Sequence, residues 1–238
     1  MSKLIWDSVG ERFYENGVDH GVLYLLNTDN NTYDSGVSWN GLISVAENPS
    51  GGESNPQYAD NIKYLDLLSK EDFGATVTCF TYPTEWELCD GTVSPVAGMT
   101  IGQQSRKTFG LSYRTLVGND LLGNDYAYKL HLVYNGTASP SERDYQTVND
   151  SPDALEFSWE IDTTPVTLTT KVDGKTLKAT SILTIDSSNF TTTALRAKLD
   201  TLEAALFGTD ADPEDPQSVA TDPYLPDPDT VISMLSAT

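Results

Sequence analysis

The chain has 238 residues, and its 35 Asp and Glu against 14 Lys and Arg give a formal charge of -21. A surface this acidic repels other polyanions, which excludes proteins that grip nucleic acid through its phosphates and disfavours binding to anionic membranes. Hydrophobic residues make up 38% of the chain, enough for a packed core and too many for global disorder. No secretory signal and no transmembrane span are expected. Cys79 and Cys89 are expected to be free thiols, the alternative being a disulfide between them.

The clearest local pattern is the alternation of apolar and polar side chains in residues 155–162. Trp159 belongs to an apolar face of this segment, whereas Glu156, Glu160 and Asp162 belong to the opposite face. This period of two predicts a half-buried strand with an acidic exposed face.

Residues 126–134 show the same alternation, with aromatic and leucine side chains at every second position. Turn-forming residues at 118–124 precede them, so residues 109–117 and 126–134 are expected to form a hairpin. Further strand candidates, all rich in β-branched or aromatic residues, are 21–27, 37–46, 73–82, 164–172 and 178–186. The last two flank the turn dipeptide Asp173-Gly174 and are expected to pair. At least eight strands therefore predict a mainly β fold.

Helices are expected in two places. Residues 194–207 carry leucines spaced by four, three and four residues and are followed by Gly208, the pattern of an amphipathic helix with its stop signal. A shorter helix is expected over residues 60–69, where apolar residues recur every three positions. Each helix has one apolar stripe, so both are expected to lie against a sheet.

Two segments fit a compact domain poorly. Residues 47–59 contain two prolines and two adjacent glycines, which indicates a long functional loop. Residues 209–238 are acidic and rich in proline, without Lys or Arg, and cannot form a core of their own. We therefore predict a β-rich domain over residues 1–208 and a C-terminal arm over residues 209–238.

Residues suited to catalysis or metal binding are sparse. The chain has two histidines, His20 and His131, and neither stands in a nucleophile motif. Glu156 and Glu160 lie about 13 Å apart along one strand, too far for a glycosidase pair, although a pair from different strands stays open. Residues 210–215 are expected to be a solvated acidic linker, the alternative being a weak Ca²⁺ or Mg²⁺ site. The sequence thus predicts no catalytic residue, no cofactor and no metal, and a protein that is not an enzyme.

A set of longer sequence words stands in a characteristic order: SWNGL at 38–42, YADNIKYL at 58–65, EDFGA at 71–75, IGQQSRKTFGL at 101–111, the strand at 126–134 and NDSP at 149–152. Together, over about residues 6–185, these words resemble the major tail proteins, or tail tube proteins, of long-tailed siphophages that infect Gram-positive bacteria.

This resemblance implies a β-sandwich or barrel protomer of the phage tail-tube type, with one flanking α-helix, a long inter-ring loop and an extended C-terminal arm. It implies that copies of the chain form stacked, hexameric rings, and that double-stranded DNA passes through the resulting tube during ejection. The implied partners are the chain itself and the tape measure, terminator and distal tail proteins, with no membrane. The implied location is the virion tail, after synthesis in the cytoplasm of the host bacterium.

Two candidate sites follow from the residues and the resemblance together. The acidic strand face of Glu156, Glu160 and Asp162 is expected to line the lumen, because an acidic wall does not retain DNA. The inter-ring loop is expected to include Pro49, Gly51, Gly52, Glu53 and Pro56. The alternatives are a tube subunit of a tail-like particle or secretion system and, from another class, a carbohydrate-binding module. A hydrolase would require a pocket with clustered carboxylates.

Overall fold

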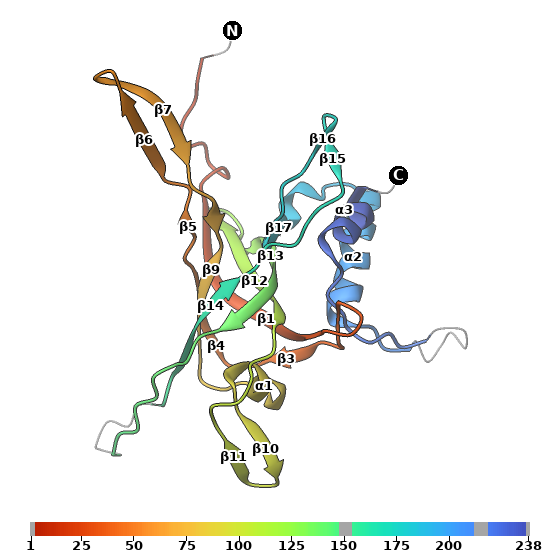
Figure 1. Ribbon diagram of the computed structural model, residues 1–238. Coiled ribbons are helices and arrows are strands. Elements are labelled where there is room, and N and C mark those ends of the chain that lie inside the picture. The colour runs from red at the N-terminus through yellow and green to blue at the C-terminus, as the bar shows by residue number, and fades with distance from the viewer. Residues whose placement is uncertain (1–2, 148–153, 212–218, 237–238) are drawn as a thin grey trace.

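One antiparallel sheet of nine strands organises the chain in the computed structural model, which describes residues 3–147, 154–211 and 219–236 (Figure 1). The strands of this sheet are β1 (Phe13–Asn27), β2 (Thr32–Tyr33), β3 (Val37–Trp39), β4 (Leu42–Glu47), β9 (Gly74–Cys79), β12 (Phe109–Asn119), β13 (Gly123–Ala138), β14 (Phe157–Thr163) and β17 (Ile182–Asp186). Their order is β2-β1-β12-β13-β14-β9-β4, with β17 added to β13 and β3 added to β1. The expected mainly β fold is confirmed.

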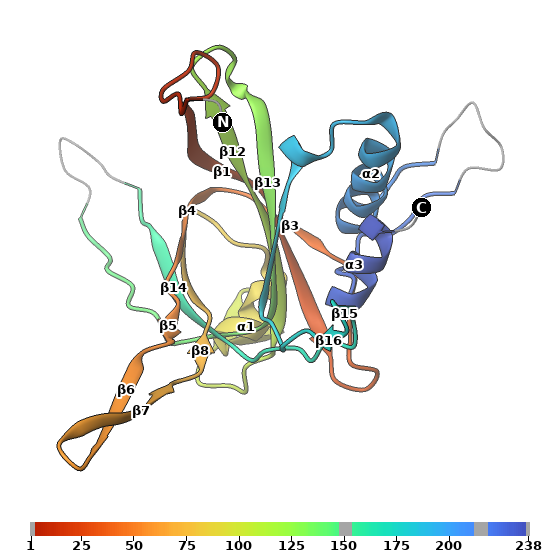
Figure 2. The same cartoon turned by 90° about the horizontal axis from the view of Figure 1, so that it is seen from above.

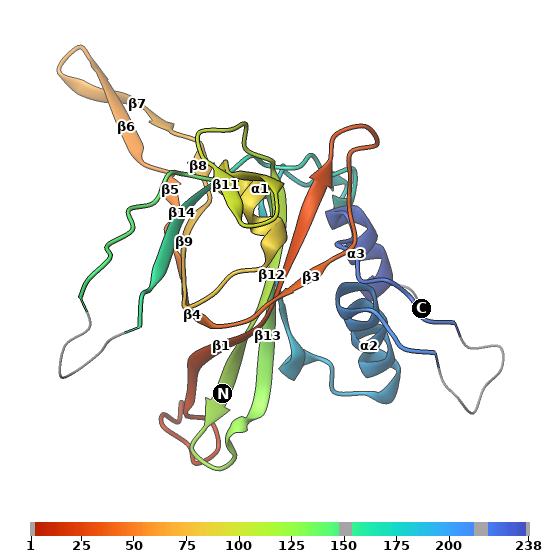
Figure 3. The same cartoon turned by 90° about the horizontal axis from the view of Figure 1, so that it is seen from below.

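The sheet folds over so that its two halves enclose the first hydrophobic core. Strands β1, β12 and β13 form one half, and β4, β9 and β14 form the other (Figure 2). Trp39, Trp86 and Trp159 meet in this core, with ring centroids 4.6 to 6.3 Å apart. The turn η1 (Thr84–Trp86) and the short helix α1 (Glu87–Asp90) lie across one end of the space between the halves (Figure 3).

Two helices cover the outer face of β1, β12 and β13 and enclose a second core. These are α2 (Thr193–Phe207) and α3 (Pro228–Ser236), and the turn η2 (Ser187–Asn189) precedes them. Leu199, Leu202 and Leu206 of α2 are buried against the sheet, as the leucine spacing predicts. The layers are therefore half-sheet, core, half-sheet, core and helices (Figure 2).

Four two-stranded pairs lie outside the large sheet: β5 (Ser50–Gly51) with β8 (Glu71–Asp72), β6 (Ser54–Ala59) with β7 (Ile62–Leu68), β10 (Val93–Val96) with β11 (Met99–Ile101), and β15 (Lys171–Val172) with β16 (Lys175–Thr176). The first two pairs are continuous along the chain. We call residues 50–72 the arm, because together they form one long projection from the body (Figure 1).

The two strongest strand predictions are confirmed. β12 and β13 pair as the expected hairpin, with Leu116 opposite Tyr128. In β14 the side chains of Trp159 and Ile161 are buried, whereas Glu160 and Asp162 are exposed. β13 differs in one respect, because it is buried on both faces: its residues 130–134 lie between the two cores.

The helix expected over residues 60–69 is wrong, since these residues form the turn of the arm and β7. Asp60 and Asn61 have φ angles of 50° and 62°, which is the conformation of a two-residue hairpin turn. Apolar residues spaced by three are compatible with one face of a helix and also with the two faces of a strand. The left-handed turn at Asp60 and Asn61 interrupts a helix there and lets β7 pair with β6. The loop expected over residues 47–59 is also largely paired, because it supplies β5 and β6.

The strand expected over residues 37–46 is divided into β3 and β4, which pair with different neighbours. Gly41 separates them with a φ of 76°, and a Cβ at this position would lie 2.8 Å from the Thr81 side chain. Within the described residues, the strands expected at 164–172 and 178–186 are joined by the single Val166–Thr180 bridge. β15 lies in the first of them but pairs with β16, in the turn between the two. β17 pairs with β13 instead, because its apolar side chains complete the second core.

The C-terminal segment is not wholly extended, since residues 228–236 form α3 and pack on α2 and the sheet. Leu225 and Val231 are buried, at 3% and 2% exposure. Buried Tyr134 donates to the carbonyl of Pro226 in this segment at 3.0 Å, and buried Tyr24 donates to that of Leu206 in α2 at 2.7 Å. The described part of residues 209–238 therefore docks on the chain's own sheet.

Candidate assembly surfaces

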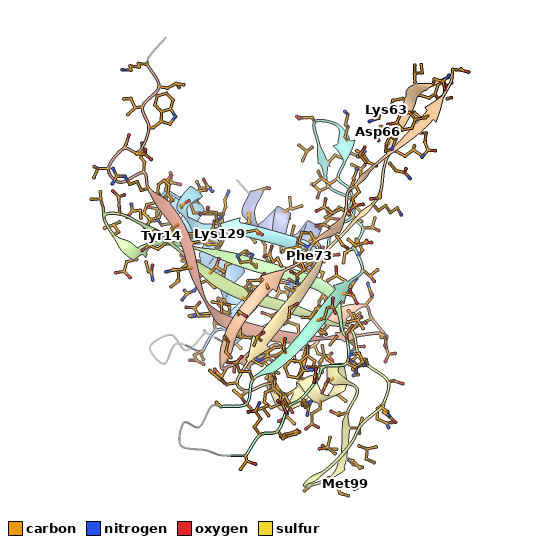
Figure 4. All side chains as sticks on the ribbon, turned by 90° about the vertical axis from the view of Figure 1, so that its left-hand side faces the viewer. Tyr14, Lys63, Asp66, Phe73, Met99 and Lys129 are labelled. Atoms are coloured by element: carbon orange, nitrogen blue, oxygen red, sulfur yellow. The ribbon has the colours of Figure 1, made fainter. Side chains whose placement is uncertain are left out.

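The arm is the largest projection with uncovered apolar side chains. Every residue of β7 is exposed, and Tyr64 and Leu68 at 68% and 76% exposure are among the least covered. At the end of the arm, Lys63 forms an ion pair with Asp66 (Figure 4). An isolated two-stranded hairpin is at best marginally stable in water, and exposed apolar patches of this kind are typical of interaction sites.

The predicted inter-ring residues lie at the root of the arm and in β6: Pro49 immediately precedes β5, and Glu53 immediately precedes β6. Gly51 is in β5 with a φ of 82°, and Gly52 follows with a φ of 69°. A Cβ at Gly51 would lie 2.0 Å from the carbonyl oxygen of Lys70, so the close approach of the two chains requires glycine there. Pro56 is in β6. Their role between rings stays a prediction, and the tip of the arm at Asp60 is a turn where a helix was expected.

Two more apolar surfaces, on the segment 3–12 and on the β10–β11 hairpin, were not predicted from the sequence. The segment 3–12 exposes Leu4, Ile5 and Trp6 by 71%, 80% and 72%. The β10–β11 hairpin exposes Val96 by 60% and Met99 by 50%, and Met99 lies at the far end of its projection (Figure 4). A sequence signal existed for the hairpin, because residues 91–105 contain no charged side chain in a chain of net charge -21.

The outer face of β4, β9 and β14 is open and polar. Glu160 pairs across the sheet with Thr76, and Ser158 pairs with Thr78. Asp162 and the neighbouring Glu156, which precedes β14, are exposed as well. The structure thus places the three predicted lumen carboxylates on or beside one open strand face, and their role in a lumen stays a prediction.

A polar cleft adjoins this face at the root of the arm. It has a volume of about 470 Å³, and Asp72, Glu160 and Asp162 contribute carboxylates to its lining. Among residues 3–147, 154–211 and 219–236 no cluster of His, Cys, Asp and Glu has the arrangement of a metal site. The prediction of an acidic linker, with a weak cation site as the alternative, concerns Asp212, Glu214 and Asp215, which lie outside the described residues.

The most concentrated group of titratable side chains lies between the two halves of the sheet. His131 Nε2 is 2.9 Å from the Thr115 hydroxyl, and its Nδ1 is 3.1 Å from Glu47 Oε1 without being aligned for a hydrogen bond. Tyr113 stacks on the His131 ring at 4.6 Å and donates to Glu47 at 2.7 Å. Burial lowers the pKa of His131, and burial together with the Glu47 carboxylate raises that of Tyr113.

Thr115, His131 and Glu47 are arranged as hydroxyl, imidazole and carboxylate, the order of a hydrolase triad. The position of Thr115 in the sheet does not suit catalysis. Thr115 is in the middle of β12 and pairs with Lys129 of β13, whereas β1 pairs with Arg114 and Leu116 on either side of it. It is not on a turn or at a helix start, where backbone N–H groups typically form an oxyanion hole. The cluster instead joins β4 to β12 and β13. The described cysteines are both buried free thiols, and burial raises the pKa of Cys89 to about 12, which suppresses its nucleophilicity.

No family model matches the chain, and no curated protein matches its sequence. Among solved structures, the sheath-tube complex of the extracellular contractile injection system PVC in its extended state is 13% identical, with a TM-score of 0.30 over 70% of this chain and 88% of that one. The baseplate of the anti-feeding prophage (AFP) is 8% identical, with a TM-score of 0.32 over 76% and 97%. Likeness of this extent carries no conclusion about function. Within the described ranges, no helix has the length and apolar character to cross a membrane.

Proposed function

We propose that this chain is a structural subunit of a phage tail tube, which self-assembles into stacked rings through its projecting hairpins and has no catalytic role. The observation that carries the proposal is the arm, in which apolar side chains on both faces of β6–β7 have no cover from the chain itself. A subunit that functions alone gains nothing from such a surface, whereas a ring or filament subunit buries it against the next copy. The order of the sequence words from 38–42 to 126–134 supports the same assembly.

The open acidic face supports the use of this tube as a DNA conduit. Glu160 and Asp162 stand among the hydroxyls of Thr76, Thr78 and Ser158, in a row of short side chains. Such a wall offers no Lys or Arg that would release counterions from DNA phosphates, so a duplex would pass without being held. In this proposal Glu156, Glu160 and Asp162 line the lumen, and the helical layer of α2 and α3 lies on the outside.

The second candidate is a tube subunit of a tail-like particle or a secretion system, which would show the same uncovered arm but carry a different cargo. A carbohydrate-binding module would instead be monomeric and would bind glycans. The cargo of the assembled tube separates the first two candidates, and the state of assembly separates both from the third.

The test is electron microscopy with sedimentation of the concentrated chain, beside the variant Tyr64→Glu/Leu67→Glu. The chain is expected to form rings or tubes, and the variant is expected to remain monomeric because two carboxylates on the arm oppose burial against an acidic neighbour. The matched control Val219→Glu changes an apolar residue that is 76% exposed outside the arm and is expected to assemble normally. A chain that stays monomeric at high concentration and high salt contradicts the proposal.

A further inference from the structure

The β10–β11 hairpin differs from every other described projection in its charge. Residues 91–105 contain no Asp, Glu, Lys or Arg, although the chain carries 49 such side chains in 238 residues. Val93 pairs with Ile101 and Val96 with Met99, and the four side chains are 38% to 60% exposed. The hairpin is fixed at its base, since Gln104 donates to the carbonyl of Gly91 at 2.9 Å, and it points away from the body (Figures 1 and 4). It presents a neutral and apolar end.

A groove of about 560 Å³ on the same molecule has the matching character. It lies between β1, β3 and the end of α2, and no carboxylate, Lys or Arg contributes to its lining. Val22, Trp39 and Leu206 are buried below it, while Ser38 and Asn40 are exposed beside it. Phe207 lies against His20, with ring centroids 5.8 Å apart. The other two clefts described for the chain both contain carboxylates, among them Glu15 and Asp186 in one and Glu160 in the other.

We propose that the β10–β11 hairpin of one copy docks, through Val96 and Met99, into the groove beside Ser38, Trp39 and Phe207 of the next copy. The inference deepens the proposed function, on which it rests, by naming the two surfaces of one contact between subunits. The contact is head-to-tail, because two different patches meet, and such a contact generates a ring or a filament.

The lack of charged side chains makes the β10–β11 hairpin the best-suited occupant of the groove. Copies of a chain with charge -21 repel one another, and a carboxylate brought into an apolar groove would also lose its hydration. The arm carries Glu53, Asp60 and Asp66, and the segment 3–12 carries Asp7 and Glu11. The β10–β11 hairpin can bury its apolar side chains without adding charge repulsion between copies and without removing a carboxylate from water. Two carboxylates are next to lining residues in sequence. Asp19, beside His20, is held by Arg114 through two hydrogen bonds of 2.7 and 2.8 Å and lies 3.0 Å from the His20 Nδ1, whereas Asp222, beside Pro223, is exposed.

The first experiment places a charge on each surface separately. Met99→Glu on the hairpin and Ser38→Glu beside the groove are each expected to raise the concentration needed for half-maximal assembly by about tenfold or more, the equivalent of losing about 1.4 kcal/mol. The control Val172→Glu, at a position that is 53% exposed in β15, is expected to assemble like the unaltered chain. Circular dichroism and thermal unfolding establish that all variants fold.

The second experiment pairs the changes. Met99→Lys combined with Ser38→Glu is expected to restore assembly toward that of the unaltered chain, because opposite charges then meet across the contact. Normal assembly of both single variants, or a failure of the pair to recover where both singles are folded, overturns the inference. Retained assembly of Met99→Glu with lost binding to lipid vesicles also overturns it and identifies a membrane as the occupant. If the unaltered chain never assembles, the proposed function itself fails, which is a distinct result.

Discussion

The carboxylate of Asp229, near the start of α3, accepts hydrogen bonds from both the backbone N–H and the hydroxyl of Thr169, at 2.8 and 2.6 Å. Its other oxygen accepts the same pair from Thr170, at 3.0 and 2.6 Å. Four donors on one side chain join the C-terminal helix to the segment that leads into β15. These bonds, from Thr169 first, lower the pKa of Asp229 well below its ordinary value.

The first prediction concerns this latch. Asp229→Asn is expected to lower the melting temperature at neutral pH and to speed hydrogen exchange in residues 219–236, because the neutral amide loses the charge-assisted bonds. Since the folded pKa lies below the unfolded value of 3.8, the latch stabilises above about pH 3.8 and is lost as the pH falls further. The difference between variant and unaltered chain should therefore shrink in acid. Asp200→Asn, on the exposed side of α2, is the control and should change neither quantity.

The second prediction concerns Tyr134, whose buried hydroxyl donates to the Pro226 carbonyl. Tyr134→Phe keeps the ring and leaves that carbonyl without its donor, so the free energy of unfolding is expected to fall by about 1–3 kcal/mol. Denaturant titration measures the change. Tyr64→Phe removes an equally polar group from a side chain that is 68% exposed, and the same titration should show no difference from the unaltered chain. Equal effects of the two substitutions would refute the structural role of the Tyr134 bond.

The sequence correctly predicted those helices and strands whose apolar residues fit a single period. The alternation around Trp159 and the leucines of α2 each have a single explanation, since one face of the element is buried. Residues 60–69 carry an ambiguous pattern, and both faces of β7 are exposed, so no buried face selected the period. The deciding signal was the turn pair Asp60-Asn61, whose left-handed conformation Asp and Asn tolerate.

α3 had a local signal that the acidic, proline-rich composition obscured. Asp227 accepts from the Thr230 backbone N–H at 3.0 Å, the bond of a helix N-cap, and Pro228 occupies the first helical position. The sequence did not show which part of the chain this helix packs against. It is stabilised by the tertiary packing of Val231 in the second core. The groove beside Trp39 likewise had no signal in the sequence, because only the fold brings β1, β3, the end of α2 and Pro223 together.

The third prediction concerns the turn of the arm. Asn61→Gly is expected to keep the arm and to stabilise it slightly, because glycine adopts a φ of 62° without strain. Asn61→Val is expected to disorder the turn, since a β-branched residue is strongly disfavoured there. Hydrogen exchange of β6 and β7 reports the difference. If assembly uses the arm, Asn61→Val should also weaken it while Asn61→Gly does not; equal assembly would remove the arm from the contact.

The fourth prediction concerns His131, whose pKa burial lowers below 6.5 despite the nearby carboxylates of Glu47 and Glu15. The unfolded chain then binds a proton more readily than the folded one, so this residue's contribution to stability is expected to fall as the pH drops through 6.5. His131→Gln removes the titrating group, and its stability should change less than that of the unaltered chain between about pH 7 and pH 5. Denaturant midpoints at several pH values measure both slopes, and equal slopes would exclude His131 as their source.

The last prediction tests the acidic lumen. Glu160→Lys/Asp162→Lys is expected to leave the tube intact, because both side chains are exposed and neither contributes to a core. The basic wall should then hold double-stranded DNA, with an affinity that falls steeply between about 50 and 200 mM salt as counterions compete. Asp200→Lys/Asp29→Lys changes the formal charge equally at exposed positions elsewhere. DNA retained by both variants alike would show that total charge, and not the β14 face, governs passage, and β14 would lose its place in the lumen.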